Sequence, residues 1–148
     1  MEAIAPDQVR TQVRKFWELF SSKDKRSFAQ LYAPTATVFA ADARRSEPAR
    51  LMLVRREREL FAPTSSVQAR CGEITIQALG LSIAVAAYPL HFSLTRILPN
   101  GSRVHSDVPL ARVTQVFHRN ENGELIIIHE HMSSAEPVVT KTLPASAG

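Results

Sequence analysis

The N-terminal part of the chain carries apolar residues at three- and four-residue intervals, the spacing of a helix with one buried face. Over residues 8–22 this spacing predicts an amphipathic helix, with Asp7 as its N-cap. The residues on its apolar face are Val9, Val13, Phe16, Trp17 and Phe20. Asp24 predicts the cap of a second, shorter helix, because Phe28 follows on its apolar face and Pro34 prevents the helix from continuing.

A strand is expected at 35–41, followed by a third helix that starts at Ser46-Glu47-Pro48 and runs to Phe61. From residue 66 onward the pattern changes to strands separated by turns, at 66–79, 82–98, 103–119 and 124–133. Helices and strands that occupy separate parts of a chain indicate an α+β fold, with the helices on one face of a sheet. Pro89 and Pro109 lie inside the two longest strands, so we expect a bulge or bend there and a strongly curved sheet.

The last predicted strand is apolar on both faces. Strict alternation places Leu125 and Ile127 on one face, and Ile126, Ile128 and Met132 on the other. The helices can cover only one of these faces, so the strand predicts a second cover. We expect a partner subunit, in a homodimer or a larger homo-oligomer; the alternative is that the C-terminal tail folds back over the outer face.

Composition indicates one globular domain, since 148 residues with 45% hydrophobic residues can form a single core. The net charge of +4 leaves nucleic-acid binding open, but the aromatic residues belong to the apolar periodicities and do not alternate with basic ones. We therefore expect no nucleic-acid partner. The single cysteine, Cys71, excludes a disulfide framework and a cysteine zinc site, and it favours a reducing, cytoplasmic location.

The longest uncharged run, 74–95, was a candidate membrane span by length alone. Polar residues, Gly80 and Pro89 interrupt it, and its apolar residues alternate in places. The run therefore predicts two strands and a turn, and we expect no membrane partner.

His129 and His131 are two apart on the last strand, so they share one face, and Glu130 projects from the other. An even-numbered turn at 120–123 would keep Arg112, Thr114, Val116 and His118 on the histidine face. The same turn would place Val113, Gln115 and Phe117 with Glu130. A three-residue turn would exchange the two sets.

Several residues could carry chemistry. A His-x-His pair can hold two corners of a zinc site, but the local spacing supplies no third ligand, so we expect a structural role and no metal. The candidates for acid–base catalysis are His91, Asp107 and His129, because imidazole titrates near neutrality and burial raises a carboxyl toward it. The few glycines form no phosphate-binding loop, which argues against a nucleotide cofactor, and we expect no cofactor.

Large aromatic residues end the two apolar helix faces. Trp17, Phe20 and Tyr32 would line a cavity if the curved sheet leaves one under the helices, and plain core packing is the alternative. Residues of the closing strands would complete such a pocket, and the candidates are Arg112, Gln115 and His131.

The order helix, short helix, strand, helix and long meander resembles the nuclear transport factor two superfamily, which includes ketosteroid isomerase, SnoaL-like polyketide cyclases and the kinase association (hub) domain. The most specific part is Val116-Phe117-His118-Arg119 followed by Ile128-His129-Glu130-His131-Met132-Ser133-Ser134, which is similar to the closing strands of SnoaL-like and hub-type members. The resemblance implies an α+β, cone-shaped roll with three N-terminal helices packed on a strongly curved, mainly antiparallel sheet. It also implies a single SnoaL-like domain over 1–136 and a C-terminal tail at 137–148.

Some positions depart from the family pattern. Where ketosteroid isomerases carry a catalytic aspartate this chain has Ala40, with Asp42 two residues later. Where hub-type members carry ligand-binding arginines it has Ser93 and Gln115. Both departures bear on activity more than on fold.

The resemblance implies a small-molecule-binding protein, and an isomerase or cyclase that moves a proton on a carbonyl compound without a cofactor. In such a site His91, Asp107 or His129 would take the proton, and Tyr32 or Gln115 would stabilise the enolate oxygen. The alternative is a non-catalytic oligomerisation or ligand-binding domain of the hub type. The expected partners are a small apolar or carbonyl-containing molecule and further copies of the chain.

Overall fold

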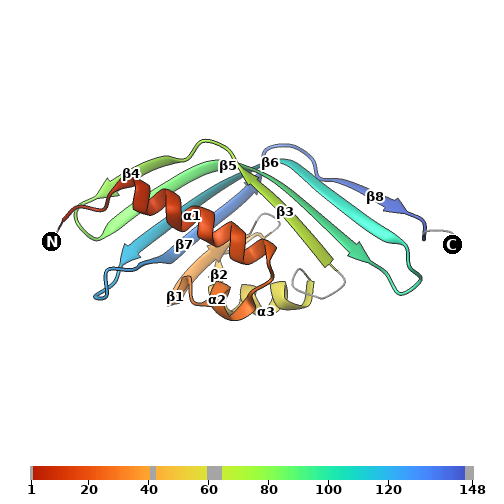
Figure 1. The fold of residues 1–148 in the computed structure, drawn as a ribbon, viewed down its shortest axis with the longest axis horizontal. Coiled ribbons are helices and arrows are strands. Elements are labelled where there is room, and N and C mark those ends of the chain that lie inside the picture. The colour runs from red at the N-terminus through yellow and green to blue at the C-terminus, as the bar shows by residue number, and fades with distance from the viewer. Residues whose placement is uncertain (1, 41–42, 60–64, 146–148) are drawn as a thin grey trace.

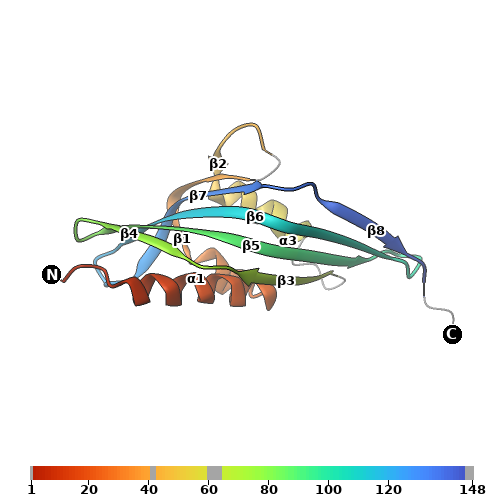
Figure 2. The same ribbon diagram turned by 90° about the horizontal axis from the view of Figure 1, so that it is seen from above.

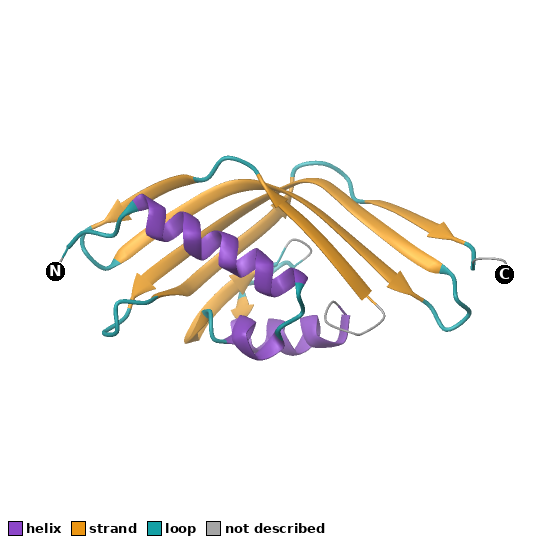
Figure 3. Cartoon of the chain, viewed as in Figure 1, coloured by secondary structure: helices purple, strands orange, loops and turns teal. Residues whose placement is uncertain are grey.

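The structure is a computed structural model that describes residues 2–40, 43–59 and 65–145, with only the backbone for 56–59. Three helices and eight strands follow one another along the described chain (Figures 1 and 3). Their bounds are α1 (Pro6–Ser21), α2 (Lys25–Ala29), β1 (Tyr32–Phe39), β2 (Glu47–Pro48), α3 (Ala49–Glu59), β3 (Ser65–Cys71), β4 (Thr75–Leu79), β5 (Ile83–Ile97), β6 (Arg103–Arg119), β7 (Leu125–Ser134) and β8 (Val139–Leu143).

All the strands belong to one sheet with the order β2-β1-β7-β6-β5-β3, in which β4 also pairs with β5 and β8 with β6. Only β1 and β7 are parallel, and the other pairs are antiparallel. The sheet forms an arch, and the three helices lie under and in front of it (Figure 1). This is the α+β, curved and mainly antiparallel architecture expected from the sequence.

The arch bends where the two prolines lie. The pairing of β5 with β6 shifts register between Leu90 and Phe92, opposite Pro109. One side of the bend holds β4, β7 and β1, and the other holds β3 and β8 (Figure 2). The predicted bulge is confirmed, because proline cannot donate a ladder hydrogen bond.

Two helix starts were predicted from capping residues, and one prediction is wrong. The N-cap of α1 is Ala5, whose backbone N–H donates to Gln8 Oε1 at 2.8 Å, and Asp7 lies in the first turn, where it pairs with Arg10. Pro6 sets this start, since its fixed φ and missing N–H suit the first helical position. Asp24 does cap α2, accepting the Ser27 N–H at 3.1 Å.

Four expected elements differ in extent. The strand expected at 35–41 is β1 at Tyr32–Phe39, so Tyr32, expected at the end of the second helix, begins a strand. The third helix begins at Ala49, because Glu47 and Pro48 pair with β1 as β2; its expected end at Phe61 lies outside the described residues. The single strand expected at 66–79 is two strands separated around Gly72, where an added Cβ would lie 2.5 Å from the Pro89 ring. The expected tail contributes β8, which pairs with the first half of β6 and covers no part of β7.

Alternation along the strands defines two faces of the sheet. We call the face that packs against α1 and α2 the inner face, and the opposite one the outer face. The inner face carries side chains that are almost fully buried, among them Ala84, Tyr88, Val113, Phe117 and Ile127. Within the described residues no helix is long and apolar enough to cross a bilayer.

Candidate functional site

The turn between β6 and β7 decides which closing-strand residues face inward. The Asn120 N–H donates to the Glu124 carbonyl at 2.9 Å, so the turn encloses three residues. Without any other irregularity, this odd number would exchange the two predicted sets of residues between the faces of the sheet. However, β7 contains one extra residue, Ile128, between the partners of Phe117 and Val116. This bulge compensates for the turn and restores the expected pairing near the histidines.

The predicted grouping is confirmed near the histidines: Gln115 pairs with Glu130, and Val116 and Thr114 pair with His129 and His131. Gln115 and Glu130 lie on the inner face, and the two histidines lie on the outer face.

Met132 pairs with buried Val113 and shares the inner face with Glu130, as expected. Strict alternation also placed Leu125 and Ile127 on the histidine face and Ile126 on the face of Glu130, and those predictions are wrong. Leu125 and Ile127 are buried on the inner face and Ile126 pairs with His118 on the outer face, because strict alternation does not hold across the bulge.

A chain of buried polar side chains crosses the inner face. Trp17 Nε1–H donates to Tyr88 Oη at 2.8 Å, and Tyr88 Oη–H donates to Gln115 Oε1 at 2.8 Å. Gln115 Nε2–H donates to Glu130 Oε2 at 2.7 Å, and Tyr32 Oη–H donates to both Glu130 oxygens at 3.1 Å. Every donor in this chain therefore points along a path that ends on the Glu130 carboxylate.

Burial makes these hydrogen bonds obligatory. Gln115 and Glu130 have no exposed surface, and Trp17, Tyr32 and Tyr88 are at most 6% exposed. Burial raises the pKa of the Tyr88 phenol well above its ordinary value, the negative charge of Glu130 raises it further, and the hydrogen bond from Trp17 opposes both. Tyr88 is thus held as a neutral phenol that can donate to Gln115.

Aromatic rings fill the space beside this chain. Phe16 lies with its ring centroid 4.8 Å from Trp17 and 4.9 Å from Phe28, and Phe20 lies 5.9 Å from Phe92 of the sheet. Phe16, Phe20 and Phe28 are at most 2% exposed. Trp17, Phe20 and Tyr32 are therefore packed in the hydrophobic core between helix and sheet.

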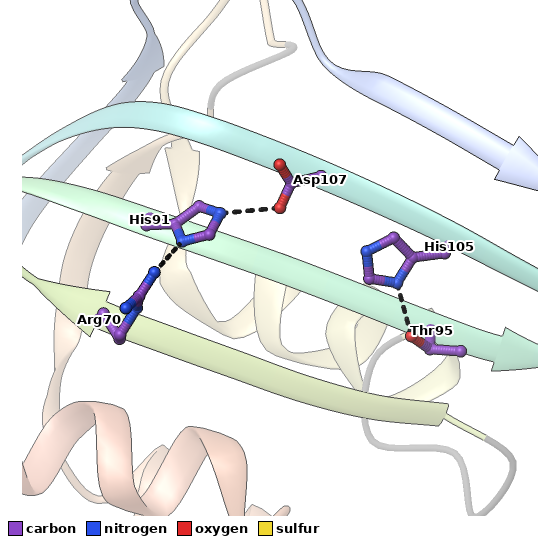
Figure 4. Close-up of polar contacts among 5 residues, drawn as sticks. All are labelled: Arg70, His91, Thr95, His105 and Asp107. Atoms are coloured by element: carbon purple, nitrogen blue, oxygen red, sulfur yellow. Dashed lines mark hydrogen bonds and ion pairs between the residues drawn. The ribbon is translucent and has the colours of Figure 1, made fainter.

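The predicted acid–base residues His91 and Asp107 come together on the outer face (Figure 4). His91 Nε2 lies 2.8 Å from Asp107 Oδ1, and His91 Nδ1 lies 3.0 Å from an Arg70 nitrogen. A guanidinium can only donate, so Nδ1 accepts and Nε2–H donates to the carboxylate. Both ring nitrogens of His91 are engaged, and its basic lone pair is occupied by Arg70.

His129, His131 and Arg112 of the closing strands also lie on the outer face. His129 Nδ1 is 2.8 Å from Thr37 Oγ1, the His131 ring is 5.4 Å from that of Phe39, and Arg112 donates to Ser133 Oγ at 3.2 Å. The structure thus brings together Trp17, Phe20, Tyr32 and Gln115 on the inner face, and it places Arg112 and His131 with the histidines on the other.

Tyr88 and Glu130 are the members of the buried chain that the sequence analysis did not select. Glu130 had a signal, because the face argument already placed it with Gln115. Tyr88 also had one, since it alternates with Ala84, Ala86 and Leu90 in an apolar strand. Among the described residues no group of three His, Cys, Asp or Glu side chains could hold a metal ion.

Two surface hollows lie away from the buried chain. A groove of about 630 Å³ runs between α1, α2 and the β6–β7 turn, and its lining includes Gln12, Lys15 and Gln30 but none of the predicted site residues. A smaller hollow of about 410 Å³ beside β3 includes Arg70 and His91.

No family model and no curated protein matches the sequence. Solved structures do match the fold. An NTF2-like protein of unknown function from Pseudomonas putida is 17% identical, with a TM-score of 0.65 over 86% of this chain and 84% of that one. The CaMKII hub homology domain of Chlamydomonas reinhardtii is 19% identical, with a TM-score of 0.67 over 90% of this chain and 100% of that one. This chain has the NTF2-like fold.

ActVI-ORFA from Streptomyces coelicolor extends the NTF2-like likeness, at 11% identity and a TM-score of 0.70 over 87% of this chain and 96% of that one. Identities this low show a shared fold and leave function to the residues of the site. In this NTF2-like chain Ala40 follows directly after β1, and Asp42 lies outside the described residues.

Proposed function

We propose that this chain is a non-catalytic, homo-oligomerising domain of the hub type, which assembles through the outer face of β4, β5, β6, β7 and β1. The observation that supports this most is a block of the outer face without acidic, lysine or arginine side chains. Three rows of paired residues cross these strands there. The rows are Leu79, Ile83, His118 and Ile126; Gln77, Val85, Val116, His129 and Thr37; and Thr75, Ala87, Thr114, His131 and Phe39.

We call these three rows the outer patch. In a chain with 22% charged residues, an exposed sheet face normally carries several of them. The central members Val85 and Val116 are half-buried by their neighbours alone, and the helices lie on the other side of the sheet. Uncharged side chains on an uncovered sheet face fit a second copy of the same patch, because an apolar surface needs no complementary charge.

The size of the outer patch suits the centre of an interface. Its rows run along β6 from Thr114 to His118, about 16 Å at about 3.3 Å per residue, and five strands about 4.8 Å apart span about 20 Å. The resulting area, about 300 Å², is part of the roughly 800 Å² that each partner buries in a standard protein interface, and residues around the patch would supply the rest.

The non-catalytic part of the proposal is supported by the separation of the chemical groups. The hypothesis of proton transfer needs a base within hydrogen-bond reach of the substrate that Tyr32 or Gln115 holds. His91, Asp107 and His129 lie across the sheet from those two residues. A molecule bound on the inner face would not contact them.

The test is a charge placed at the centre of the outer patch. Val116→Glu should convert the oligomer to a monomer at micromolar concentration, because two copies of a buried carboxylate would face each other, and light scattering after gel filtration measures the mass. Leu51→Glu is the matched control, since Leu51 is 53% exposed on α3, away from the outer patch. A wild-type monomer, or a Val116→Glu protein that stays assembled with its circular dichroism unchanged, would contradict the proposal.

A second candidate function rests on the Glu130 carboxylate. A fully buried carboxylate that receives hydrogen bonds from Tyr32 and Gln115 is the kind of constellation found where a ligand or a proton is handled. Binding would require the aromatic residues of α1 to move. A small aromatic ketone such as 1-tetralone, at millimolar concentration, should then raise the melting temperature of the wild type and not of Gln115→Leu. An unchanged melting temperature would count against this candidate.

A further inference from the structure

Histidines are distributed unevenly in this molecule. The chain has five, at positions 91, 105, 118, 129 and 131, and sheet pairing places all of them on the outer face. Each row of the outer patch holds one of three: His118, His129 or His131. We call these three the patch histidines. The other two lie outside the outer patch, with His91 at the bend of the sheet and His105 beyond it (Figure 4).

The surroundings of the two groups differ in charge. Every residue paired with a patch histidine in the sheet is uncharged; these residues are Ile83 and Ile126, Val116 and Thr37, and Thr114 and Phe39. Arg112 lies two residues from Thr114 on the same face of β6, and its side chain is positively charged. The carboxyl residue Glu124 lines the groove beside α1. His91, in contrast, already contacts the Asp107 carboxylate at 2.8 Å.

We propose that the patch histidines make self-association of this domain dependent on pH, with the assembly favoured at neutral pH and weakened by mild acid. This inference rests on the proposed assembly through the outer patch. In a symmetric interface each patch faces its own copy, so every protonated imidazole is met by the same set of uncharged or cationic residues. Each added charge therefore has to be desolvated without a counter-ion.

The direction follows from ordinary imidazole chemistry. A histidine side chain is neutral above about pH 7 and gains a proton as the pH falls through about 6.5. Protonation before assembly costs nothing in solvent, whereas protonation inside the interface places several positive charges close together. Association thus competes with proton binding, and acid favours the separated subunits.

The experiment measures the dissociation constant by sedimentation at about pH 8 and about pH 5.5. For the wild type we expect it to rise by about tenfold or more at the lower pH, since like-charge contacts at an interface cost several kcal/mol. The variant His118→Asn/His129→Asn/His131→Asn keeps hydrogen-bonding groups but cannot titrate, so its dissociation constant should stay nearly constant. The matched control His91→Asn/His105→Asn removes the two histidines outside the outer patch and should retain the pH response.

A second measurement does not depend on the variants folding. If like charges drive dissociation, raising the salt concentration at about pH 5.5 should restore part of the wild-type association, because salt screens exposed charges. A wild-type dissociation constant that is equal at both pH values overturns this inference and leaves the proposed assembly standing. A wild-type monomer at about pH 8 overturns both, and a triple variant that keeps the full pH response overturns the inference alone.

Discussion

The same three strands, β5, β6 and β7, carry opposite chemistry on their two faces. On the inner face polar groups are few and fully buried. They belong to one chain of hydrogen bonds, which ends on the Glu130 carboxylate. On the outer face polar groups are more numerous and half-exposed, as in the contacts of His91 with Asp107 and of His129 with Thr37.

This contrast separates stability from association. A buried hydrogen bond stabilises the fold mainly because breaking it leaves a buried polar group without a partner. In a half-exposed pair, water can replace the lost partner at little cost in free energy. Inner-face substitutions should therefore change the free energy of unfolding. Outer-face substitutions should change the assembly and leave the subunit folded.

The largest difference in stability between the two faces is expected at two adjacent residues of β6. Phe117 has no exposed surface, and Phe117→Ala should lower the free energy of unfolding by about 3–5 kcal/mol, since it leaves a cavity in the core. Its neighbour Val116 points outward, and Val116→Ala should cost about 1 kcal/mol or less. Urea unfolding at one low protein concentration measures both. Equal losses of unfolding free energy in the two variants would mean that the two faces are equally buried and would contradict the separation of stability from association.

A second pair of neighbours tests the buried polar chain. Gln115→Leu removes the acceptor of the Tyr88 hydroxyl and a donor to Glu130, and should cost about 1–3 kcal/mol. Thr114→Val, one residue away on the outer face, should stay within about 0.5 kcal/mol. The same denaturation assay measures both variants. A Gln115→Leu protein as stable as the wild type would show that the buried hydrogen bonds do not contribute to the free energy of unfolding.

Alkaline pH tests the inner face without disturbing its packing. Because the pKa of Tyr88 is raised in the folded protein, its contribution to stability is complete below about pH 10, where a free phenol titrates, and is lost as pH rises toward the folded value. The unfolding free energy should therefore fall as the pH rises above about 10, and less steeply in Tyr88→Phe. Burial raises the pKa of the Cys71 thiol to about 11, with Arg14 opposing the rise, so the comparison belongs in a Cys71→Ala background.

The smallest effect is expected at the outer ion pair. Asp107→Asn removes the charge beside His91, where both side chains are about one-third exposed, and should change stability by at most about 1 kcal/mol. Thermal unfolding measures it. A loss as large as that of Gln115→Leu would place this pair among the residues that hold the fold together.

Much of the fold could be predicted from periodicity. The first helix, the cap at Asp24 and the bend near Pro89 each follow from a local rule, and the structure confirms them; the helix expected at 8–22 lies at Pro6–Ser21. The start of α3 and the position of β8 could not be predicted, because both depend on pairing with strands distant in sequence. Local patterns do not specify which edge of a sheet a short strand will join.

The candidate site was harder to predict than the fold. The sequence selected Tyr32 and Gln115 but could not connect them to Tyr88 and Glu130, since the four residues come from four different strands. The grouping of His129 with Val116 was predicted on the assumption of an even turn, and the structure gives the same grouping through an odd turn plus a bulge. Two departures from the simplest hairpin cancel here.

The bulge at Ile128 also decides which side chains this domain keeps for its surface. Substitutions at His129, Glu130 or His131 alter one side chain at a time, but a ladder that kept Ile128 and lost the bulge would pair Ile128 with Val116 and His129 with Gln115. The imidazoles would then turn toward the helices and the carboxylate toward solvent. A local change of pairing around one residue thus separates a domain with its ionisable bases on the surface from one that presents them to its interior.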